Sequence, residues 1–304
     1  MIDTIIIGGG PAGMTAALYL LRAGKSVLIL EKESFGGQIA RSPRFENYPM
    51  VKSISGLEWS DALFGQINEL GAEFDLAEVT GVEKRGEGHF LVHTNYGDKE
   101  AKSLIIASGC NHRKLGLPRE DELLGKGISY CATCDGAFFT GKDVLVIGDA
   151  NTALQYAILL SSLCRSVKIV TLFDRFFADD ILVKRMKEIP NISYVMEYEA
   201  KKFLGDDSLT GVSFENTKTK EKVTFPCDGC FICIGQVPAN EPFKDLVTLN
   251  KGFIETDETM ASKTKGIYAA GDCRVKGVRQ VVTALGDAAT AATAAANYLN
   301  ALEK

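Results

Sequence analysis

The chain has 304 residues, of which 46% are hydrophobic and 24% charged, and its formal net charge is −5. This length suffices for two domains that bury a large cofactor, and the negative charge argues against a general binder of nucleic acids or anionic membranes. No apolar run reaches the length of about 18 residues that a membrane-spanning helix needs. No charged leader with a cleavage site precedes the first strand, so we expect a cytoplasmic protein whose eight cysteines mostly stay reduced.

The chain contains two copies of a strand–turn–helix–strand pattern. The first copy has strands at 4–7 and 27–30 around a helix at 14–23, and the second has strands at 144–147 and 167–172 around a helix that ends at 163. Short strands are expected near 78–82, 89–94 and 104–107, and a similar set near 192–197, 210–215 and 229–234. An alanine-rich helix begins near Arg279.

The last segment of the chain resembles the end of the first domain, which predicts an insertion. Residues 1–111 and 243–304 then form one domain, and residues 117–239 form the other. The expected fold class is α/β, with two Rossmann-like nucleotide-binding domains of the three-layer ββα type, the second inserted in the first.

The first glycine turn, Gly8-x-Gly10-x-x-Gly13, predicts a dinucleotide site. Gly8 permits the tight turn, Gly10 lets the backbone approach a pyrophosphate, and Gly13 allows the helix to pack closely on the strand. The helix N-terminus then faces the phosphates. Glu31, at the end of the second strand, accepts a hydrogen bond from a ribose hydroxyl.

The sequence Cys131-Ala-Thr-Cys134-Asp135 predicts a redox dithiol. Half of a zinc site is the alternative, but no second CxxC accompanies the pair, and His89, His93 and His112 do not have ligand spacing. Asp135 adjoins the two sulfurs and is the candidate acid–base group for the departing thiolate. We therefore favour redox chemistry over metal binding.

Six motifs, in chain order, resemble the low-molecular-weight thioredoxin reductases. They are Gly8-Gly-Gly-Pro-Ala-Gly13, Gly36-Gly-Gln38, Glu46-Asn-Tyr-Pro49, Ser129-Tyr-Cys-Ala-Thr-Cys-Asp-Gly136, Gly271-Asp272 and Arg279-Gln-Val281. The match spans nearly the whole chain, and the motif around the two cysteines is specific to that family.

The resemblance implies an FAD-dependent disulfide oxidoreductase that reduces thioredoxin and is usually a homodimer. In this family Cys134 faces the flavin, Cys131 attacks the protein substrate and Asp135 donates the proton. The residues implied to bind FAD are Gly8, Gly10, Pro11, Ala12, Gly13, Glu31, Lys32, Gly37, Gln38, Asn47, Val79, Gly109, Asp272, Arg279, Gln280 and Val281. The family also rotates one domain against the other, so that the dithiol meets flavin and substrate in turn.

The second glycine turn departs from the NADPH-dependent members of the family. It reads Gly148-Asp149-Ala150-Asn-Thr-Ala153, so that a methyl group and a carboxylate stand where a pyrophosphate would bind. Those members then carry a His-Arg-Arg-x-x-x-Arg motif that holds the 2′-phosphate, whereas residues 173–180 here keep only Arg175, beside Asp174. Both changes argue against NADPH.

Several electron donors remain open. Loss of both NADPH motifs is the mark of the ferredoxin-dependent flavin thioredoxin reductases, so we favour reduced ferredoxin as donor, passing electrons through FAD to Cys131–Cys134 and on to thioredoxin. NADH stays an alternative because Asp174 can accept from a 2′-hydroxyl. A different disulfide partner, a second flavin stacked on Phe173, Phe176 and Phe177, and a non-catalytic flavoprotein are further alternatives.

Two other groups of residues also have ordinary structural interpretations. Basic residues at 184, 185, 187, 201 and 202 can attract an acidic ferredoxin, although each alone is typical of a solvated face. Cys227, Cys230 and Cys233 have the opening spacing of an iron–sulfur motif but lack the fourth cysteine, so we interpret them as core thiols and expect no metal.

Overall fold

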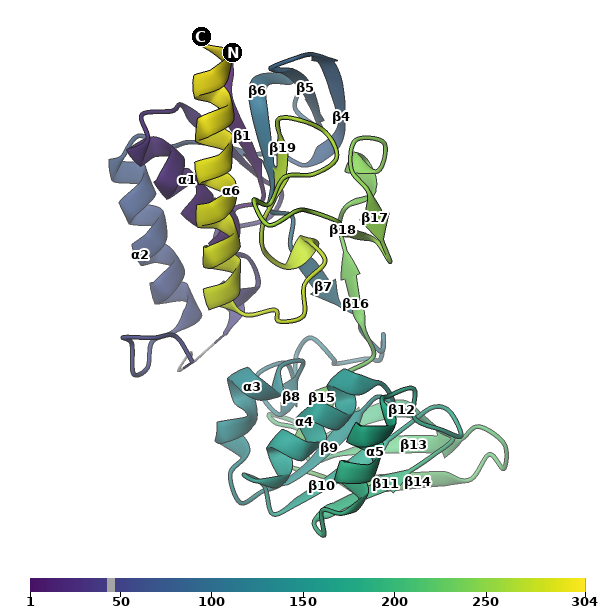
Figure 1. Cartoon of the computed structure of the whole chain (residues 1–304). Helices are drawn as coiled ribbons and strands as arrows, with labels where there is room; N and C mark the ends of the chain where they lie inside the picture. The colour runs from purple at the N-terminus through teal and green to yellow at the C-terminus, as the bar shows by residue number, and fades with distance from the viewer. Residues whose placement is uncertain (43–46, 304) are drawn as a thin grey trace. The chain divides into compact units, whose positions relative to one another are not determined.

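The computed structural model describes residues 1–42 and 47–303, which form two compact units (Figure 1). Unit 1 comprises Met1–Asn111 and Val237–Lys304, and unit 2 comprises His112–Gln236. Unit 2 is thus inserted into unit 1. The chain passes between the units in strands β7 (Cys110–His112) and β16 (Gln236–Pro238), which pair with each other.

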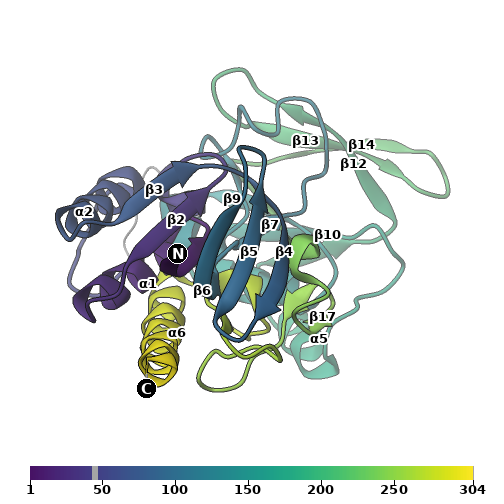
Figure 2. The same cartoon turned by 90° about the horizontal axis from the view of Figure 1, so that it is seen from above.

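The sheet of unit 1 combines a parallel nucleotide-binding core with an antiparallel extension. Strand β6 (Lys99–Ile106) belongs to both, because one of its edges pairs with β1 (Ile2–Ile7) and the other pairs first with β5 (His89–Thr94) and then with β19 (Ile267–Ala269). Beyond β1 the parallel core continues into β2 (Val27–Glu31) and β3 (Glu73–Leu76), and beyond β5 the antiparallel part continues into β4 (Val79–Gly86) (Figure 2).

Three helices cover one face of this sheet: α1 (Pro11–Arg22), α2 (Gly56–Glu69) and α6 (Val281–Leu302) (Figure 1). Alanines of α6, such as Ala288 and Ala291, are fully buried against α1, because small side chains allow two helices to approach closely. On the other face, side chains of the parallel core pack with side chains of the antiparallel extension (β4 and β5) and of the short pair β17 (Leu249–Asn250) and β18 (Phe253–Ile254).

Unit 2 repeats this layering around a fully parallel sheet in the order β11-β10-β9-β15-β8. The strands are β8 (Ile128–Ser129), β9 (Asp143–Ile147), β10 (Ser166–Val170), β11 (Ile192–Val195) and β15 (Gly229–Ile232). Helices α3 (Ala132–Asp135), α4 (Asn151–Ser161) and α5 (Asp180–Lys187) share one core with this sheet. A three-stranded antiparallel sheet, β12 (Tyr198–Leu204), β13 (Gly211–Asn216) and β14 (Lys222–Pro226), covers the other face.

The α/β fold with two Rossmann-like nucleotide-binding domains is therefore confirmed, but the short strands are distributed differently from our expectation. The segments near 192 and 229 belong to the parallel sheet, and only β13 lies in the antiparallel one. Its neighbours β12 and β14 were missed, since their many exposed polar residues give a weak strand pattern.

Short 3-10 helices complete the described chain: η1 (Gly37–Arg41), η2 (Gly136–Phe139), η3 (Glu241–Phe243) and η4 (Gly271–Cys273). Among the described residues, no helix has both the length and the apolar character needed to cross a bilayer.

Candidate functional site

The first glycine turn, between β1 and α1, is shaped by its three glycines in different ways. A Cβ on Gly8, where φ is +113°, would lie 2.3 Å from the carbonyl oxygen of Ala107, and a Cβ on Gly13 would lie 1.8 Å from the carbonyl oxygen of Gly8. A Cβ on Gly10 would meet nothing closer than the Cα of Gly37, at 3.9 Å. The fold therefore requires Gly8 and Gly13, whereas Gly10 leaves room beside the backbone for a ligand.

Residues around this turn hold it in place. Pro11 occupies the first turn of α1, where no backbone N–H is needed, and Ala12 is buried. Glu31 is buried and accepts the Gly9 N–H at 2.7 Å and the Glu33 N–H at 2.8 Å. A carboxylate offers about four lone pairs, so Glu31 keeps capacity for a ribose hydroxyl.

Four further predicted residues of unit 1, Gly37, Gln38, Val79 and Gly109, have these surroundings. Gly37 approaches Gly10 so closely that a Cβ on Gly37 would lie 3.2 Å from the Gly10 Cα. The Gln38 amide donates to the carbonyl oxygen of Cys110, next to Gly109, whose φ is +66°. Val79 is buried at the start of β4.

Two further predicted residues, Lys32 and Asn47, have other partners. Lys32 is exposed, and its ammonium lies 3.7 Å from the Glu33 carboxylate. Glu46 of the resemblance motif lies outside the described residues, whereas Asn47 beside it donates to the Gln280 side chain at 2.9 Å.

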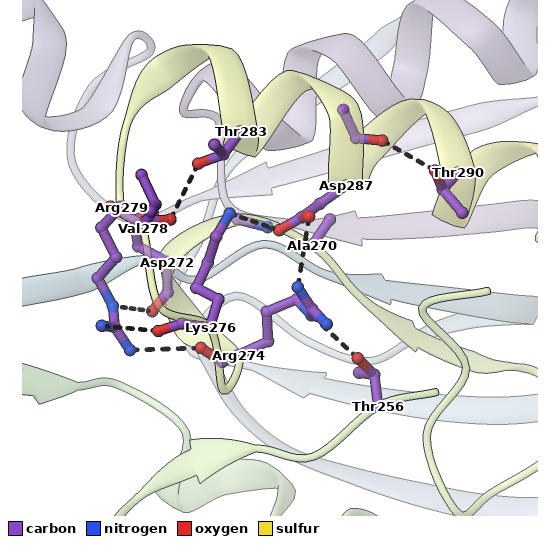
Figure 3. Close-up of polar contacts among 12 residues, drawn as sticks. Thr256, Ala270, Asp272, Arg274, Lys276, Val278, Arg279, Thr283, Asp287 and Thr290 are labelled. Carbon is purple, nitrogen blue, oxygen red and sulfur yellow. Dashed lines mark hydrogen bonds and ion pairs between the residues drawn. The ribbon is translucent and has the colours of Figure 1, made fainter. Parts of the chain in front are cut away.

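The loop before α6 belongs to unit 1 and contains the predicted residues Asp272 and Arg279 (Figure 3). The Arg279 guanidinium lies 4.2 Å from the centre of the Phe253 ring and donates to the carbonyl oxygens of Asp272, Arg274 and Lys276 at 3.3–3.5 Å. Gln280 caps α6, and Val281 begins it. The carbonyl contacts fix the loop into one conformation.

Asp287, on the second turn of α6, anchors the other side of this loop and had no sequence signal. Its carboxylate accepts the Gly271 N–H at 3.1 Å, the Lys276 ammonium at 2.7 Å and the Arg274 guanidinium at 3.3 Å (Figure 3). Asp287 thereby positions Gly271 and Asp272. The space beside Gly271 faces the glycine turn, since a Cβ on Gly271 would lie 2.9 Å from the Cβ of Ala12.

Asp272 supplies the test of whether this site fits FAD. Within the described chain, its Oδ1 is a buried oxygen without a hydrogen-bond partner, and burial raises the pKa of the carboxyl. A buried unpaired carboxylate oxygen is costly unless a ligand donor meets it. Together with the open backbone at Gly10, this oxygen fits the polar chain of a dinucleotide cofactor.

The redox pair lies in unit 2, between β8 and η2. Cys131 and Cys134 form a disulfide whose Cα atoms are 5.3 Å apart, and both residues are half-buried. The Cys134 and Asp135 N–H groups both donate to the Cys131 carbonyl oxygen, which closes the short helix α3 around the sulfurs.

Asp135 is held by Ser129, a residue of the motif to which the sequence assigned no role. Ser129 Oγ donates to Asp135 Oδ2 at 2.6 Å and accepts the Cys131 N–H at 3.0 Å. Burial raises the pKa of Asp135, and the Ser129 hydrogen bond opposes that shift. One hydroxyl thus fixes both the candidate proton donor and the backbone of Cys131.

The second glycine turn differs in its surroundings from the first. Ala150 occupies the N-cap position that Gly10 has in the first turn. Phe177 bridges to it, donating its N–H to the Asp149 carbonyl oxygen at 2.7 Å. Asn151 and Asp179 exchange hydrogen bonds of 2.8 and 3.0 Å. Segment 177–179 is therefore tied to the N-terminus of α4, with Asp149 and Asp179 beside it.

Two phenylalanines are exposed in the segment that would hold a 2′-phosphate, beside its charged residues. Phe173 and Phe177 are 47% and 50% exposed, and the Arg175 guanidinium lies 4.8 Å from the Phe177 ring centre. Asp174 lies four residues beyond Val170, the last residue of β10, and not at the strand end that our NADH alternative assumed.

The remaining cysteines are mostly in the cores. Cys227 and Cys230 are buried, Cys233 is half-buried at the end of β15, and burial raises the pKa of Cys227 and Cys233 to about 12. In the described chain, no group of three or more His, Cys, Asp or Glu side chains is arranged to hold a metal ion.

Comparison with known proteins identifies the family. The model of the pyridine nucleotide-disulphide oxidoreductases matches residues 2–288. The thioredoxin reductase of Bacillus subtilis (strain 168) is 39% identical over 304 residues, which cover 99% of this chain and 96% of the relative. The crystal structure of thioredoxin reductase from Streptococcus pyogenes MGAS5005 is 38% identical, covers 99% of both chains and superposes with a TM-score of 0.94.

A ferredoxin-flavin thioredoxin reductase from Clostridium acetobutylicum matches at 28% identity and a TM-score of 0.54, with 99% of this chain and 98% of that chain covered. The two relatives described above are more similar and carry the general name thioredoxin reductase, so the comparisons support the family and not specifically its ferredoxin-dependent branch. The chain belongs to the low-molecular-weight thioredoxin reductase family, as an FAD-containing oxidoreductase with a redox-active disulfide.

Proposed function

We propose that this protein reduces thioredoxin and takes its electrons from reduced ferredoxin instead of a nicotinamide. The observation that carries the choice of donor is the second glycine turn. Its N-cap residue Ala150 carries a methyl group, and the carboxylates of Asp149 and Asp179 lie where a pyrophosphate would add two further negative charges.

The lost arginines point in the same direction. Residues 173–180 contain one arginine, Arg175, and its guanidinium already stacks on Phe177. A 2′-phosphate is held by several fork-like arginine contacts, and a single stacked arginine beside Asp174 does not replace them. NADH remains the second candidate because Asp174 can accept from a ribose hydroxyl, although it lies beyond the end of β10.

The dithiol is the reaction centre of this proposal. FAD, when bound, accepts electrons singly and delivers them in pairs, which suits a one-electron donor and a two-electron acceptor. Reduction of Cys131–Cys134 consumes two electrons and two protons, supplied by two reduced ferredoxins and by solvent. The Cys131 thiolate then attacks the thioredoxin disulfide, Cys134 displaces the reduced thioredoxin, and the Cys131–Cys134 disulfide forms again.

Asp135 handles the proton in this exchange. Its buried carboxyl has a raised pKa and is held 2.6 Å from the Ser129 hydroxyl, next to Cys134. It can therefore protonate the thiolate that leaves when the disulfide opens. A non-catalytic flavoprotein has no use for this arrangement, which is why we place that alternative last.

The test is anaerobic flavin absorbance at about 450 nm, with NADPH, NADH or reduced ferredoxin added in turn. We expect bleaching by ferredoxin, and neither nicotinamide should bleach the flavin within the same period. Prompt bleaching by a nicotinamide would overturn the proposed donor. In a Cys131→Ser variant, ferredoxin should still bleach the flavin while thioredoxin reduction is lost.

A further inference from the structure

A buried carboxylate lies in the segment that follows β7, at the start of unit 2. Glu120 is 3% exposed, and its carboxylate accepts the backbone N–H groups of Leu115, Gly116 and Leu117 at 2.8–3.3 Å. Burial of a carboxylate is costly unless donors satisfy its oxygens, and these three donors wrap the segment around it. The Glu120 side chain is therefore held in one position.

A further donor to Glu120 comes from the residue next to the redox pair. The Tyr130 hydroxyl donates to Glu120 Oε1 at 2.6 Å. Burial raises the pKa of Tyr130, and the hydrogen bond to Glu120 raises it further, so the phenol keeps its proton and acts as the donor. A hydrogen bond to a carboxylate is roughly twice as strong as one between neutral groups, which anchors the Tyr130 side chain.

The Tyr130 ring has a second contact, with His112. The two rings are stacked, with 5.0 Å between their centres and 11° between their planes. His112 is the last residue of β7 and the first residue of unit 2. The Tyr130 ring also packs against the core between the parallel sheet and the antiparallel sheet of unit 2. Tyr130 is therefore held at its hydroxyl and along its ring.

This anchor restricts the backbone of Cys131, because Tyr130 directly precedes it in the chain. On its other side, the Cys131 carbonyl oxygen accepts the N–H groups of Cys134 and Asp135 at 3.3 and 3.0 Å. Two thiols whose backbones are held together form a disulfide more readily than two that move freely, because bond formation then costs less conformational entropy. Loss of the Tyr130 anchor should therefore favour the dithiol.

We propose that Tyr130 is a positioning residue whose hydrogen bond to Glu120 holds Cys131 beside Cys134 and thereby makes the disulfide harder to reduce. In the reaction concerned, two electrons and two protons break the bond between the two sulfurs and leave two thiols. The inference rests on the redox-active disulfide of the family, and it does not depend on which electron donor the protein uses.

The experiment measures the thiol–disulfide equilibrium of the FAD-loaded protein in anaerobic buffers of reduced and oxidised glutathione, without ferredoxin, nicotinamide or thioredoxin. Two reduced glutathiones supply the electrons and protons and become glutathione disulfide. After an acid quench and alkylation, mass spectrometry of the peptide that contains Cys131 and Cys134 gives the fraction of dithiol. Tyr130→Phe keeps the ring and removes the hydroxyl. We expect it to shift the equilibrium about fivefold toward the dithiol, or about 20 mV for a two-electron couple.

Two further variants separate this hydrogen bond from general damage. Tyr198→Phe removes a hydroxyl from β12, whose tyrosine packs against the same core, and should leave the equilibrium unchanged. Tyr130→Phe should shift the equilibrium less in a Glu120→Gln background, because the acceptor there has lost its charge. An unchanged equilibrium in Tyr130→Phe, an equal shift in Tyr198→Phe, or full additivity in the double variant overturns the inference. If Glu120→Gln does not fold, the comparison of the two tyrosine variants decides.

Discussion

At the scale of single residues, Ser129 connects the chemistry of Asp135 to the backbone of Cys131. The sequence motif contains both residues but gives no reason for the serine. In the structure its hydroxyl donates to the Asp135 carboxylate at 2.6 Å and accepts the Cys131 N–H at 3.0 Å. A donor to the charged form of a carboxyl favours that form, so Ser129 limits how far burial raises the pKa of Asp135.

We predict that Ser129→Ala raises the pKa of Asp135 further. Asp135 donates a proton only in its protonated form, which is lost as pH rises through its pKa, so the decline of activity at high pH should move to higher pH. The lost orientation should also lower turnover by about tenfold, as general acid catalysis contributes 10²–10⁴-fold. The pH profile of thioredoxin reduction measures both effects.

Ser129→Thr is the matched control, since it keeps the hydroxyl and suits a strand. If Ser129→Ala and Ser129→Thr have the same pH profile, the serine acts only through packing.

Substitutions at two glycines of the first turn should affect different properties, FAD binding at Gly10 and folding at Gly13. A Cβ on Gly10 would meet no atom closer than 3.9 Å, whereas a Cβ on Gly13 would lie 1.8 Å from the Gly8 carbonyl oxygen. We predict that Gly10→Ala folds but binds FAD at least tenfold more weakly, because its methyl group occupies the space beside the backbone. Gly13→Ala should be destabilised whether or not FAD is present.

Flavin content after gel filtration, together with thermal unfolding of the FAD-depleted protein, distinguishes these effects. Full flavin content in Gly10→Ala would show that the pyrophosphate lies elsewhere.

At the scale of elements, α2 illustrates a helix start that is encoded locally. The Ser55 hydroxyl accepts the Glu58 N–H at 3.1 Å, and the Glu58 carboxylate accepts the Ser55 N–H at 3.1 Å. This capping box satisfies two backbone donors that the helix itself cannot pair.

We predict that Ser55→Ala destabilises unit 1 by about 1 kcal/mol, the usual value of an N-cap. Urea unfolding of the FAD-loaded protein measures the loss, with Ser208→Ala at an exposed position of unit 2 as the control. Equal stability of the two variants would mean that packing alone fixes the start of α2.

Several contacts besides the residue at position 150 shape the turn before α4. The backbone of Phe177 and the reciprocal Asn151–Asp179 hydrogen bonds tie a second segment to this turn, independently of the residue at 150. We predict that Ala150→Gly leaves flavin bleaching by NADPH and by NADH undetectable, because Asp149 and Asp179 remain. Saturable bleaching in this variant would show that the Ala150 methyl group alone blocks the site.

At the scale of the whole molecule, recognition of ferredoxin, the acidic electron donor that we propose, must overcome a net charge of −5. A local cluster of cations does this more effectively than the average charge. Helix α5 ends with Lys184, Arg185 and Lys187, all exposed, and its partial negative charge at that end favours them even without a partner. Charge reversal decides between the two roles.

We predict that Lys184→Glu, Arg185→Glu and Lys187→Glu combined lower the ferredoxin-driven rate at low salt by about tenfold, with a weaker salt dependence than in the unchanged protein. Bleaching by dithiothreitol should be unaffected. Reversal of Lys218, Lys220 and Lys222 near the β13–β14 turn is the matched control. Equal rates in the two triple variants would exclude α5 as the docking surface.

The family resemblance also implies a homodimer, which we retain as a proposal. Sedimentation of the FAD-loaded protein tests it, and a single species near the 32.9 kDa mass of the chain would contradict it.

The sequence by itself determined the features that depend on neighbouring residues. The glycine turn, Glu31 at the strand end and the Cys131–Cys134 pair are local patterns, because turn geometry and disulfide reach act over a few residues. The apolar strands and helices of both nucleotide-binding domains follow from hydrophobic periodicity in the same way. Their order along the chain sufficed to predict the fold class.

Only the tertiary structure decided the contacts between residues far apart in the sequence. Asp287 accepts the Gly271 N–H in unit 1, and the Phe177 N–H donates to the Asp149 carbonyl oxygen in unit 2, because helices and loops pack together on the sheet of each unit. No local propensity encodes such pairs, since each partner alone is an ordinary exposed or core residue. Their chemistry arises from burial and from the hydrogen bonds that packing makes possible.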